Sequence, residues 1–184
     1  MNQLPIIIGL TGFANSGKDS ASEAFFASDA DVFAFAKPLK DAAQILFNLN
    51  HEQLYNFEDK EKLDIRWNTT PRQIMQLLGD ILRNKFGLDF FLINMENRIK
   101  NSDKKLIIIT DTRFSNEAEF IKKINGKIIQ IVRPGANTTV HNNHESEQGI
   151  SPELIDHIII NDGTIQELQL KFKMIINLLL LDTS

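Results

Sequence analysis

The chain has 184 residues, 42% of them hydrophobic, and it contains no cysteine. This composition is typical of a single globular domain with a sizeable core, and it excludes a disulfide framework and a thiolate metal site. The formal net charge of −4 argues against binding to polymeric nucleic acid or to an anionic membrane, both of which attract basic proteins.

Strands and helices are expected to alternate along the chain. Apolar runs predict strands at residues 6–11, 31–36, 105–111, 127–132 and 157–160. Between them, helical spacing and helix-start signals predict helices at residues 37–47, 71–86, 89–100 and 164–181, with further helices after Gly17 and after Asn116. This alternation predicts an α/β fold, in which helices cover both faces of a parallel sheet.

Neither end of the chain has the pattern of a targeting or membrane segment. Residues 1–5 lack a charged stretch followed by an apolar one, and the apolar stretch 174–181 is too short to span a bilayer. We therefore expect a cytoplasmic protein without a membrane partner.

A glycine-rich loop follows the first strand, where Gly12, Gly17 and Lys18 have the spacing G-x-x-x-x-G-K of a phosphate-binding loop. Glycine permits a turn whose backbone N–H groups converge on phosphate oxygens, and lysine adds a mobile positive charge. The motif usually continues with Ser or Thr, whose hydroxyl binds Mg²⁺, but this chain has Asp19 there. We expect the loop to bind nucleotide phosphates through Gly12, Asn15, Ser16, Gly17, Lys18, Asp19 and Ser20.

Charged side chains follow two other strands. Asp111 ends the third strand, where ligands bind in open parallel sheets, and its carboxylate could hold Mg²⁺ or orient an attacking oxygen. The alternative is a cap of the next turn. Arg113 points toward the same crevice unless it forms a surface salt bridge, and Arg133 closes the fourth strand, within reach of a transferring phosphoryl group.

The helix over residues 71–86 has two different faces. Ile74, Leu77, Leu78, Ile81 and Leu82 are expected to face the core. On the other face, Arg72, Gln76, Gly79 and Arg83 follow one another at helical spacing. Arginine suits phosphate recognition and glutamine can read a base edge, so this face predicts an acceptor site; a solvated face with chance arginines is the alternative.

Other candidate site residues have less support from the sequence around them. The polar loop 134–150 has the length of a lid and carries His144 and Glu147. Lys37 and Lys40 follow the second strand, where an acceptor would bind, and Asn161 and Gly163 follow the last, where an adenine contact is common. Ordinary surface charge or a turn before a helix explains each of them equally well.

Taken together, these pieces resemble a known family. In chain order they are Gly12-x4-Gly17-Lys18-Asp19, Phe35-Ala36-x-Pro38-Leu39-Lys40, Thr70-Pro71-Arg72-x3-Gln76-x-Leu78-Gly79-x3-Arg83, Asp111-x-Arg113-Phe114-x-Asn116-Glu117, Arg133-Pro134 and His144-x-Ser146-Glu147. They resemble the deoxynucleoside monophosphate kinases of large DNA phages and viruses, with phosphomevalonate kinases as cousins. Asp after the loop lysine is itself a trait of this group.

The resemblance implies a P-loop NTPase fold, a three-layer α/β sandwich with a five-stranded parallel sheet, as one domain over residues 1–184. Residues 50–100 would form the helical acceptor-binding region and residues 134–150 the lid. The implied reaction is transfer of the ATP γ-phosphoryl to a (deoxy)nucleoside 5′-monophosphate with Mg²⁺, in the host cytoplasm if the source is viral, and a homodimer is common in such folds.

The resemblance also implies roles for the residues that match its motifs. Residues 12–20, with Asn161 and Gly163, would hold ATP, and Lys18, Asp111, Arg113 and Arg133 would surround the reacting group. Asp19 and Asp111 would hold Mg²⁺, directly or through water. The acceptor would contact Lys37, Lys40, Arg72, Gln76, Arg83, His144 and Glu147.

Two alternatives remain open at this point. One is a P-loop kinase for another phosphorylated acceptor, such as phosphomevalonate or dephospho-coenzyme A. The other is a nucleotide-binding module without rapid turnover. A GTPase is disfavoured because no Asn-Lys-x-Asp base-reading motif follows the fourth strand.

Overall fold

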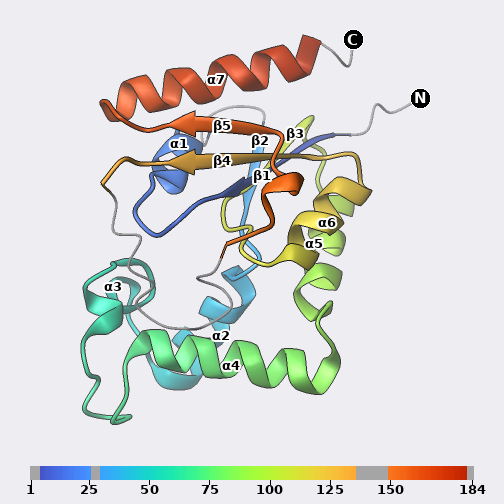
Figure 1. The fold of residues 1–184 in the computed structure, drawn as a ribbon. Helices are drawn as coiled ribbons and strands as arrows, with labels where there is room; N and C mark the ends of the chain where they lie inside the picture. Colours follow the sequence, from blue (N-terminus) through green and yellow to red (C-terminus); the bar gives the residue numbers. More distant parts are fainter. Residues whose placement is uncertain (1–4, 26–29, 136–148, 182–184) are drawn as a thin grey trace. The chain divides into compact units, whose positions relative to one another are not determined.

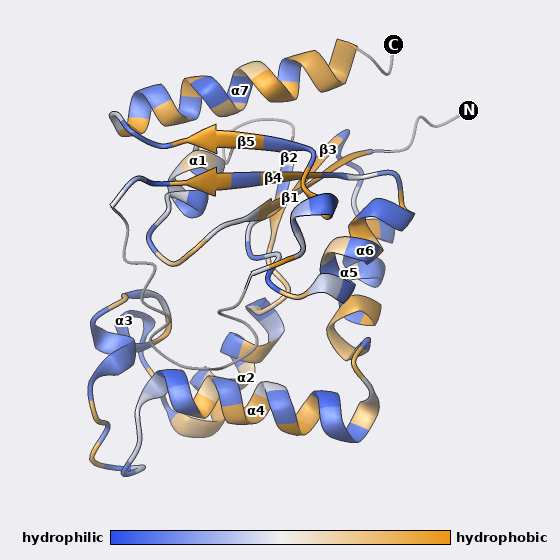
Figure 2. Cartoon of the chain, in the orientation of Figure 1, coloured by the Kyte–Doolittle hydropathy of each residue, from blue (hydrophilic) through white to orange (hydrophobic). Residues whose placement is uncertain are grey.

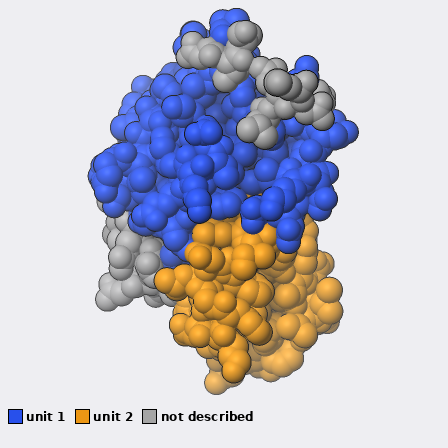
Figure 3. Space-filling model, turned by 90° about the vertical axis from the view of Figure 1, so that its right-hand side faces the viewer, with its two compact units in different colours: residues 1–34, 96–184 blue, residues 35–95 orange. Residues whose placement is uncertain are grey.

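The computed structural model describes residues 5–25, 30–135 and 149–181. The chain divides into two compact units, residues 1–34 with 96–184 and residues 35–95 (Figure 3). Each unit has its own core and is described separately below.

Unit 1 contains a five-stranded sheet in the order β2-β3-β1-β4-β5 (Figure 1). The strands are β1 (Ile6–Thr11), β2 (Ala30–Phe33), β3 (Leu106–Ile109), β4 (Lys127–Val132) and β5 (His157–Ile160). All neighbouring strands are parallel, and the register pairs Ile8 of β1 with Ile108 of β3 and Leu10 with Ile129 of β4. The predicted parallel α/β sheet is therefore confirmed, although β2 and β3 end earlier than expected.

Helices cover both faces of this sheet. Apolar residues alternate along the strands, so Ile8, Leu10 and Ile131 pack on one face with Ala21 and Phe172. These two residues belong to α1 (Lys18–Glu23) and α7 (Ile165–Leu181), and α6 (Ser115–Lys123) contacts β1 and β4 and buries Ala118 and Ile121. The central strand β1 is thus buried on both faces, as near-continuous apolar strands in parallel sheets are.

Part of α7 remains apolar at the surface. Its C-terminal half is coloured mostly as hydrophobic in Figure 2, and Met174, Leu178 and Leu181 are exposed. No helix in the described ranges, α7 included, has both the length and the apolar character needed to cross a membrane.

Unit 2 is helical. It contains α2 (Lys37–Phe47), α3 (His51–Tyr55), a 3₁₀ turn at Asp59–Glu61, α4 (Pro71–Phe86) and the first residues of α5 (Phe90–Lys100). Its small core joins Ala43, Leu49, Leu54 and Ile74. Since α2 supplies part of this core, the compact unit begins at Phe35, and Lys37 and Lys40 belong to it.

The start of α4 agrees with its sequence signals, but its apolar face does not. Thr70 and Gln73 form a reciprocal capping box, with Pro71 in the first turn. Leu77 and Ile81 are 60% and 52% exposed, so their assignment to the core is wrong. The packed stripe begins at Pro71 and Ile74; Leu77 is rotated away from it, and Ile81 lies beyond the residues that enter the core.

The segment before α4 is fixed by a buried carboxylate. Asp64 accepts hydrogen bonds from Nε of Arg66 at 2.9 Å and from Nε2 of Gln53 at 2.9 Å, and its amide donates to the carbonyl of Thr69. Hydrogen bonds from Arg66 hold the pKa of Asp64 well below its usual range, against the opposing effect of burial. The charged form of Asp64 therefore stabilises unit 2.

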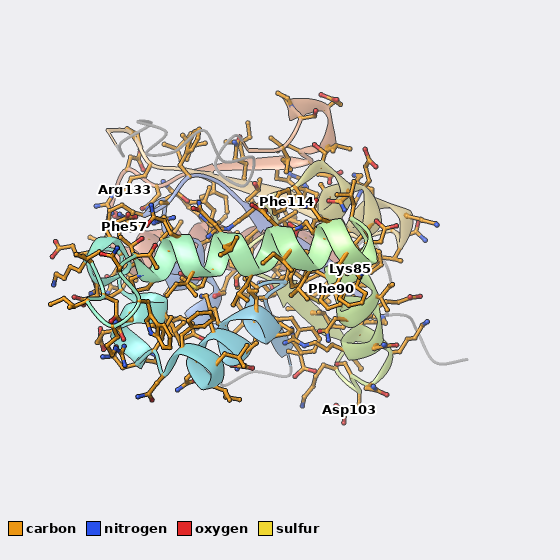
Figure 4. The ribbon with its side chains drawn as sticks, turned by 90° about the horizontal axis from the view of Figure 1, so that it is seen from below. Phe57, Lys85, Phe90, Asp103, Phe114 and Arg133 are labelled. Carbon is orange, nitrogen blue, oxygen red and sulfur yellow. The ribbon has the colours of Figure 1, made fainter. Side chains whose placement is uncertain are left out.

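We expect Asp64→Asn to remove part of the acid sensitivity of folding. A carboxyl whose folded pKa is depressed stabilises the protein above its unfolded pKa of about 3.9, and this contribution is lost as the pH falls toward the folded pKa. Thermal unfolding between neutral pH and about pH 3 should show a shallower decline for the variant, from a lower starting stability. Asp103→Asn, at an exposed position in unit 1 (Figure 4), is the control and should follow the wild type. Parallel declines for both variants would contradict this role of Asp64.

Candidate functional site

Four of the segments predicted to carry site residues lie at the carboxyl edge of the sheet in unit 1. The glycine-rich loop follows β1, Asp111 follows β3, Arg133 follows β4 and Asn161 follows β5. Because all five strands are parallel, these segments leave the sheet at the same edge. The topology therefore brings together residues separated by up to about 150 positions in the sequence, at the edge where parallel sheets bind ligands.

The loop after β1 has the backbone of a phosphate-binding turn. Gly12 and Gly17 have φ angles of 135° and 104°, and Asn15 has 61°. A Cβ at Gly12 would overlap the carbonyl oxygen of Ile131, and one at Gly17 would lie 2.6 Å from Nδ2 of Asn161. Glycine is therefore required at both positions for conformation and for space.

Lys18 lies across this loop. Its Nζ donates to the carbonyl oxygens of Gly12 at 2.7 Å and Phe13 at 2.8 Å. The ammonium group is thus held at the turn, where it can exchange these carbonyls for phosphate oxygens. Ser16 is buried, Asn15 and Asp19 are exposed, and Ser20 is partly buried.

The segment that carries Asp111 is fixed beside β1. The amide of Thr112 donates to the carbonyl of Leu10 at 3.0 Å, so the chain continues along β1 beyond the end of β3. Asp111 is partly buried and Arg113 is exposed. Buried Glu117 accepts hydrogen bonds from the amides of Arg113 and Phe114, which anchors the loop at the start of α6.

Asn161 faces the phosphate loop. Its Nδ2 donates to the carbonyl of Ser16 at 2.8 Å, and its backbone amide donates to the carbonyl of Val132. Gly163, two residues on, leaves space for the carboxylate of Glu167, which accepts from the amide of Thr164 at 2.7 Å and caps α7. These bonds lower the pKa of Glu167.

In unit 2, Arg72 is held by two neighbours. Its Nε donates to the carboxylate of Glu61, and its guanidinium carbon lies 5.7 Å from the ring centroid of Phe57, which Figure 4 labels. The Arg72 side chain is only 14% exposed. The guanidinium is therefore in a defined orientation, which is what bidentate recognition of a phosphate requires.

The other predicted residues on this face of α4 follow the same pattern. The guanidinium carbon of Arg83 lies 4.7 Å from the ring centroid of Phe91, and its Nη1 would lie 3.0 Å from a Cβ at buried Gly79. Nε2 of Gln76 is buried without a hydrogen-bond partner among the described residues. Arg72, Gln76 and Arg83 are thus partly buried on this face, and Gly79 is buried.

The two lysines of α2 have partners within unit 2. Nζ of Lys37 binds both oxygens of Asp41, at 2.5 and 2.7 Å, in an exposed pair one helical turn apart. Nζ of Lys40 lies 4.0 Å from the ring centroid of Tyr55. An acceptor phosphate would have to compete with Asp41 for Lys37.

Two predicted residues lie outside the described residues. His144 and Glu147 fall within residues 136–148, as does most of the predicted lid at 134–150. Arg133 is described, is exposed, and directly follows β4 (Figure 4).

Sequence reasoning overlooked the residues that orient the predicted ones. Glu61, Phe57 and Phe91 orient the arginines of α4, and Glu117 fixes the loop after β3. Only Glu117 had a usable signal, since it belongs to the motif Asp111-x-Arg113-Phe114-x-Asn116-Glu117, although no role was assigned to it there. The partners of the arginines depend on how the helices pack.

Comparison with known proteins identifies the family. A model of the deoxynucleotide monophosphate kinase family matches residues 54–172. A protein of Acanthamoeba polyphaga mimivirus, provisionally named a deoxynucleotide monophosphate kinase, is 38% identical over 181 residues, which cover 88% of this chain and 91% of that protein. The chain belongs to the deoxynucleotide monophosphate kinase family.

A phage relative is matched over a smaller share of its own length. The deoxynucleoside-5′-monophosphate kinase of Escherichia phage T5 is 32% identical over 119 residues. The match covers 61% of this chain and 47% of the T5 protein, so the chain spans about half the length of that relative.

The fold recurs in a solved kinase structure. The dephospho-CoA kinase from Campylobacter jejuni is 12% identical and aligns over 93% of this chain and 95% of its own, with a TM-score of 0.51. At this identity the likeness concerns the fold alone, which is the P-loop α/β fold that the sequence predicted.

Proposed function

We propose that this protein transfers the γ-phosphoryl group of ATP to a deoxynucleoside 5′-monophosphate, giving ADP and the deoxynucleoside diphosphate. The observation that carries the proposal is membership in the deoxynucleotide monophosphate kinase family together with a fully formed phosphate loop around Lys18. An oxygen of the acceptor phosphate attacks the γ-phosphorus, and the bond to the oxygen that bridges it to the β-phosphorus breaks.

Such a transfer relies on positioning and charge neutralisation more than on a strong base. In this proposal Lys18 and the loop amides bind the ATP phosphates, and Asp111 orients the attacking oxygen of the acceptor. Arg113 and Arg133 bring positive charge to the transferring group. Unit 2 binds the acceptor through Arg72, Gln76 and Arg83.

The residues of unit 1 also suit Mg²⁺. This ion prefers oxygen ligands and in kinases is held by one or two carboxylates together with phosphate oxygens. Asp19 on α1 and Asp111 after β3 are carboxylates at the phosphate-binding edge of the sheet, and Ser20 adds a hydroxyl. When bound there, Mg²⁺ would neutralise charge on the triphosphate.

A deoxynucleotide acceptor is favoured over the other phosphorylated acceptors. The mimivirus and T5 relatives, matched over 88% and 61% of this chain, are named for deoxynucleotides or deoxynucleosides. Gln76 supports a base-bearing acceptor, because its buried amide nitrogen lacks a hydrogen-bond partner among the described residues and can donate to a base edge.

The direct test is an ADP-coupled assay with dTMP, dGMP, dCMP and dAMP, their ribose counterparts, phosphomevalonate and dephospho-coenzyme A. We expect transfer to at least one deoxynucleotide, and Lys18→Ala should lower kcat by on the order of 10²–10³, as loss of a preorganised charge donor does. Unchanged turnover in that variant would contradict the loop assignment. ATP binding without transfer to any acceptor would favour a binding module.

Arg72→Ala should affect the acceptor and spare ATP. Loss of an oriented guanidinium removes a charge-assisted hydrogen bond, so we expect KM for the deoxynucleotide to rise on the order of tenfold or more. The KM for ATP should stay within about twofold of the wild type, since Arg72 belongs to unit 2. Lys85→Ala, at an exposed position near the end of the same helix (Figure 4), is the matched control. A defect confined to ATP would overturn the assignment.

We also propose that the protein is a homodimer. Leu77 and Ile81 lie one turn apart on α4, and both are more than half exposed. Contiguous exposed apolar surface favours a protein contact, and in this proposal the pair lies in such a surface. Light scattering should give twice the chain mass for the wild type and the monomer mass for Leu77→Glu with Ile81→Glu. A monomeric wild type would contradict the proposal.

A further inference from the structure

The turn between β5 and α7 is anchored independently of any ligand. Nζ of Lys171 donates to the carbonyl of Ile160 at 2.8 Å and to Oδ1 of Asp162 at 2.7 Å, and this lysine lowers the pKa of Asp162. Thr164 and Glu167 form reciprocal hydrogen bonds at the start of α7. The polar residues of the turn are therefore fixed by α7, with one exception.

That exception is Asn161, whose side chain reaches across to the phosphate loop. It is 9% exposed, and its Nδ2 lies 2.8 Å from the carbonyl oxygen of Ser16, 145 residues earlier in the chain. A carbonyl oxygen can only accept, so the amide must present its N–H₂ group there and its orientation is unambiguous. The bond to Val132 holds its backbone in the sheet.

The contact orients one particular peptide group. In a trans peptide the carbonyl oxygen and the next amide hydrogen point in opposite directions. A hydrogen bond that holds the Ser16 carbonyl toward Asn161 therefore directs the amide hydrogen of Gly17 away from it. Gly17 has φ 104° and lies at the start of α1, in the part of the loop where backbone amides meet phosphates.

We propose that Asn161 is a positioning residue for the phosphate loop, one that fixes the Ser16–Gly17 peptide in the orientation that binds the nucleotide phosphates. This inference rests on the proposed function and adds to it a residue that acts through the loop without contacting the reacting atoms. It differs from the adenine contact predicted from sequence position, because the amide nitrogen of Asn161 is already bound to Ser16.

Asn161→Asp tests this role with little change in shape. The substitution removes the donor and places a carboxylate oxygen against the Ser16 carbonyl. We expect the Kd for ATP, measured by calorimetry, to rise on the order of tenfold or more, the usual effect of leaving a buried acceptor unsatisfied. The KM for the deoxynucleotide at saturating ATP should stay within about twofold, because the residues proposed to bind the acceptor belong to unit 2.

Gln169→Glu is the matched control. Gln169 donates through Nε2 to the carbonyl of Ser20 at 2.9 Å, so this variant loses the same kind of donor from α7 to α1 but leaves the Ser16–Gly17 peptide alone. Its Kd for ATP should change by less than about threefold. Asn161→Ala, which adds no repelling charge, serves if the Asp variant fails to fold, and it should still weaken ATP binding about fivefold.

The outcomes separate this inference from the proposed function. A wild-type protein that binds no ATP or transfers no phosphoryl group would overturn the proposed function. A functional wild type with an Asn161→Asp variant that binds ATP equally well, or no worse than Gln169→Glu, would overturn only the role of Asn161. A lower melting temperature with unchanged ATP affinity would also overturn it, since that result indicates a purely structural residue.

Discussion

The candidate site in unit 1 depends on a sharp turn at the carboxyl end of β1. A buried apolar strand must give way within a few residues to a helix, and between them the backbone must curve so that its N–H groups converge. Gly12 and Gly17 permit this curve because any Cβ there would meet the Ile131 carbonyl or the Asn161 amide. Lys18, Asp111, Arg133 and Asn161 are arranged with respect to this turn by the parallel sheet.

Groups that are distant in the sequence also support the turn. The carbonyl of Ser16 accepts a hydrogen bond from the side chain of Asn161, and that of Ser20 accepts one from Gln169. The carbonyl of Leu10, near the end of β1, accepts one from the amide of Thr112. Each bond satisfies a backbone group in or near the loop with a donor from a distant part of the chain, as buried backbone requires. Loss of the Asn161 donor is expected to affect nucleotide binding before it affects the fold, because neither Ser16 nor Asn161 belongs to the apolar core of the sheet.

Unit 2 shows a different use of charge. Its arginines are held against carboxylates and aromatic rings, Arg72 by Glu61 and Phe57 and Arg83 by Phe91, whereas several apolar side chains remain exposed. Guanidinium groups oriented in advance lose less entropy when they bind a phosphate. This arrangement suits a unit that recognises an anionic acceptor.

The sequence alone determined the α/β architecture, the glycine loop and the capping box of α4, because each depends on local periodicity or on neighbouring residues. It also determined the family, through motifs spread over most of the chain. The tertiary structure decided which side of α4 is buried, since Leu77 and Ile81 satisfy the helical pattern but find no cover in the described part of the chain. The contacts of Asn161 with Ser16 and of Glu61 with Arg72 were likewise visible only in the tertiary structure. They depend on the order of the strands and the packing of the helices, which the periodicity of the sequence does not encode.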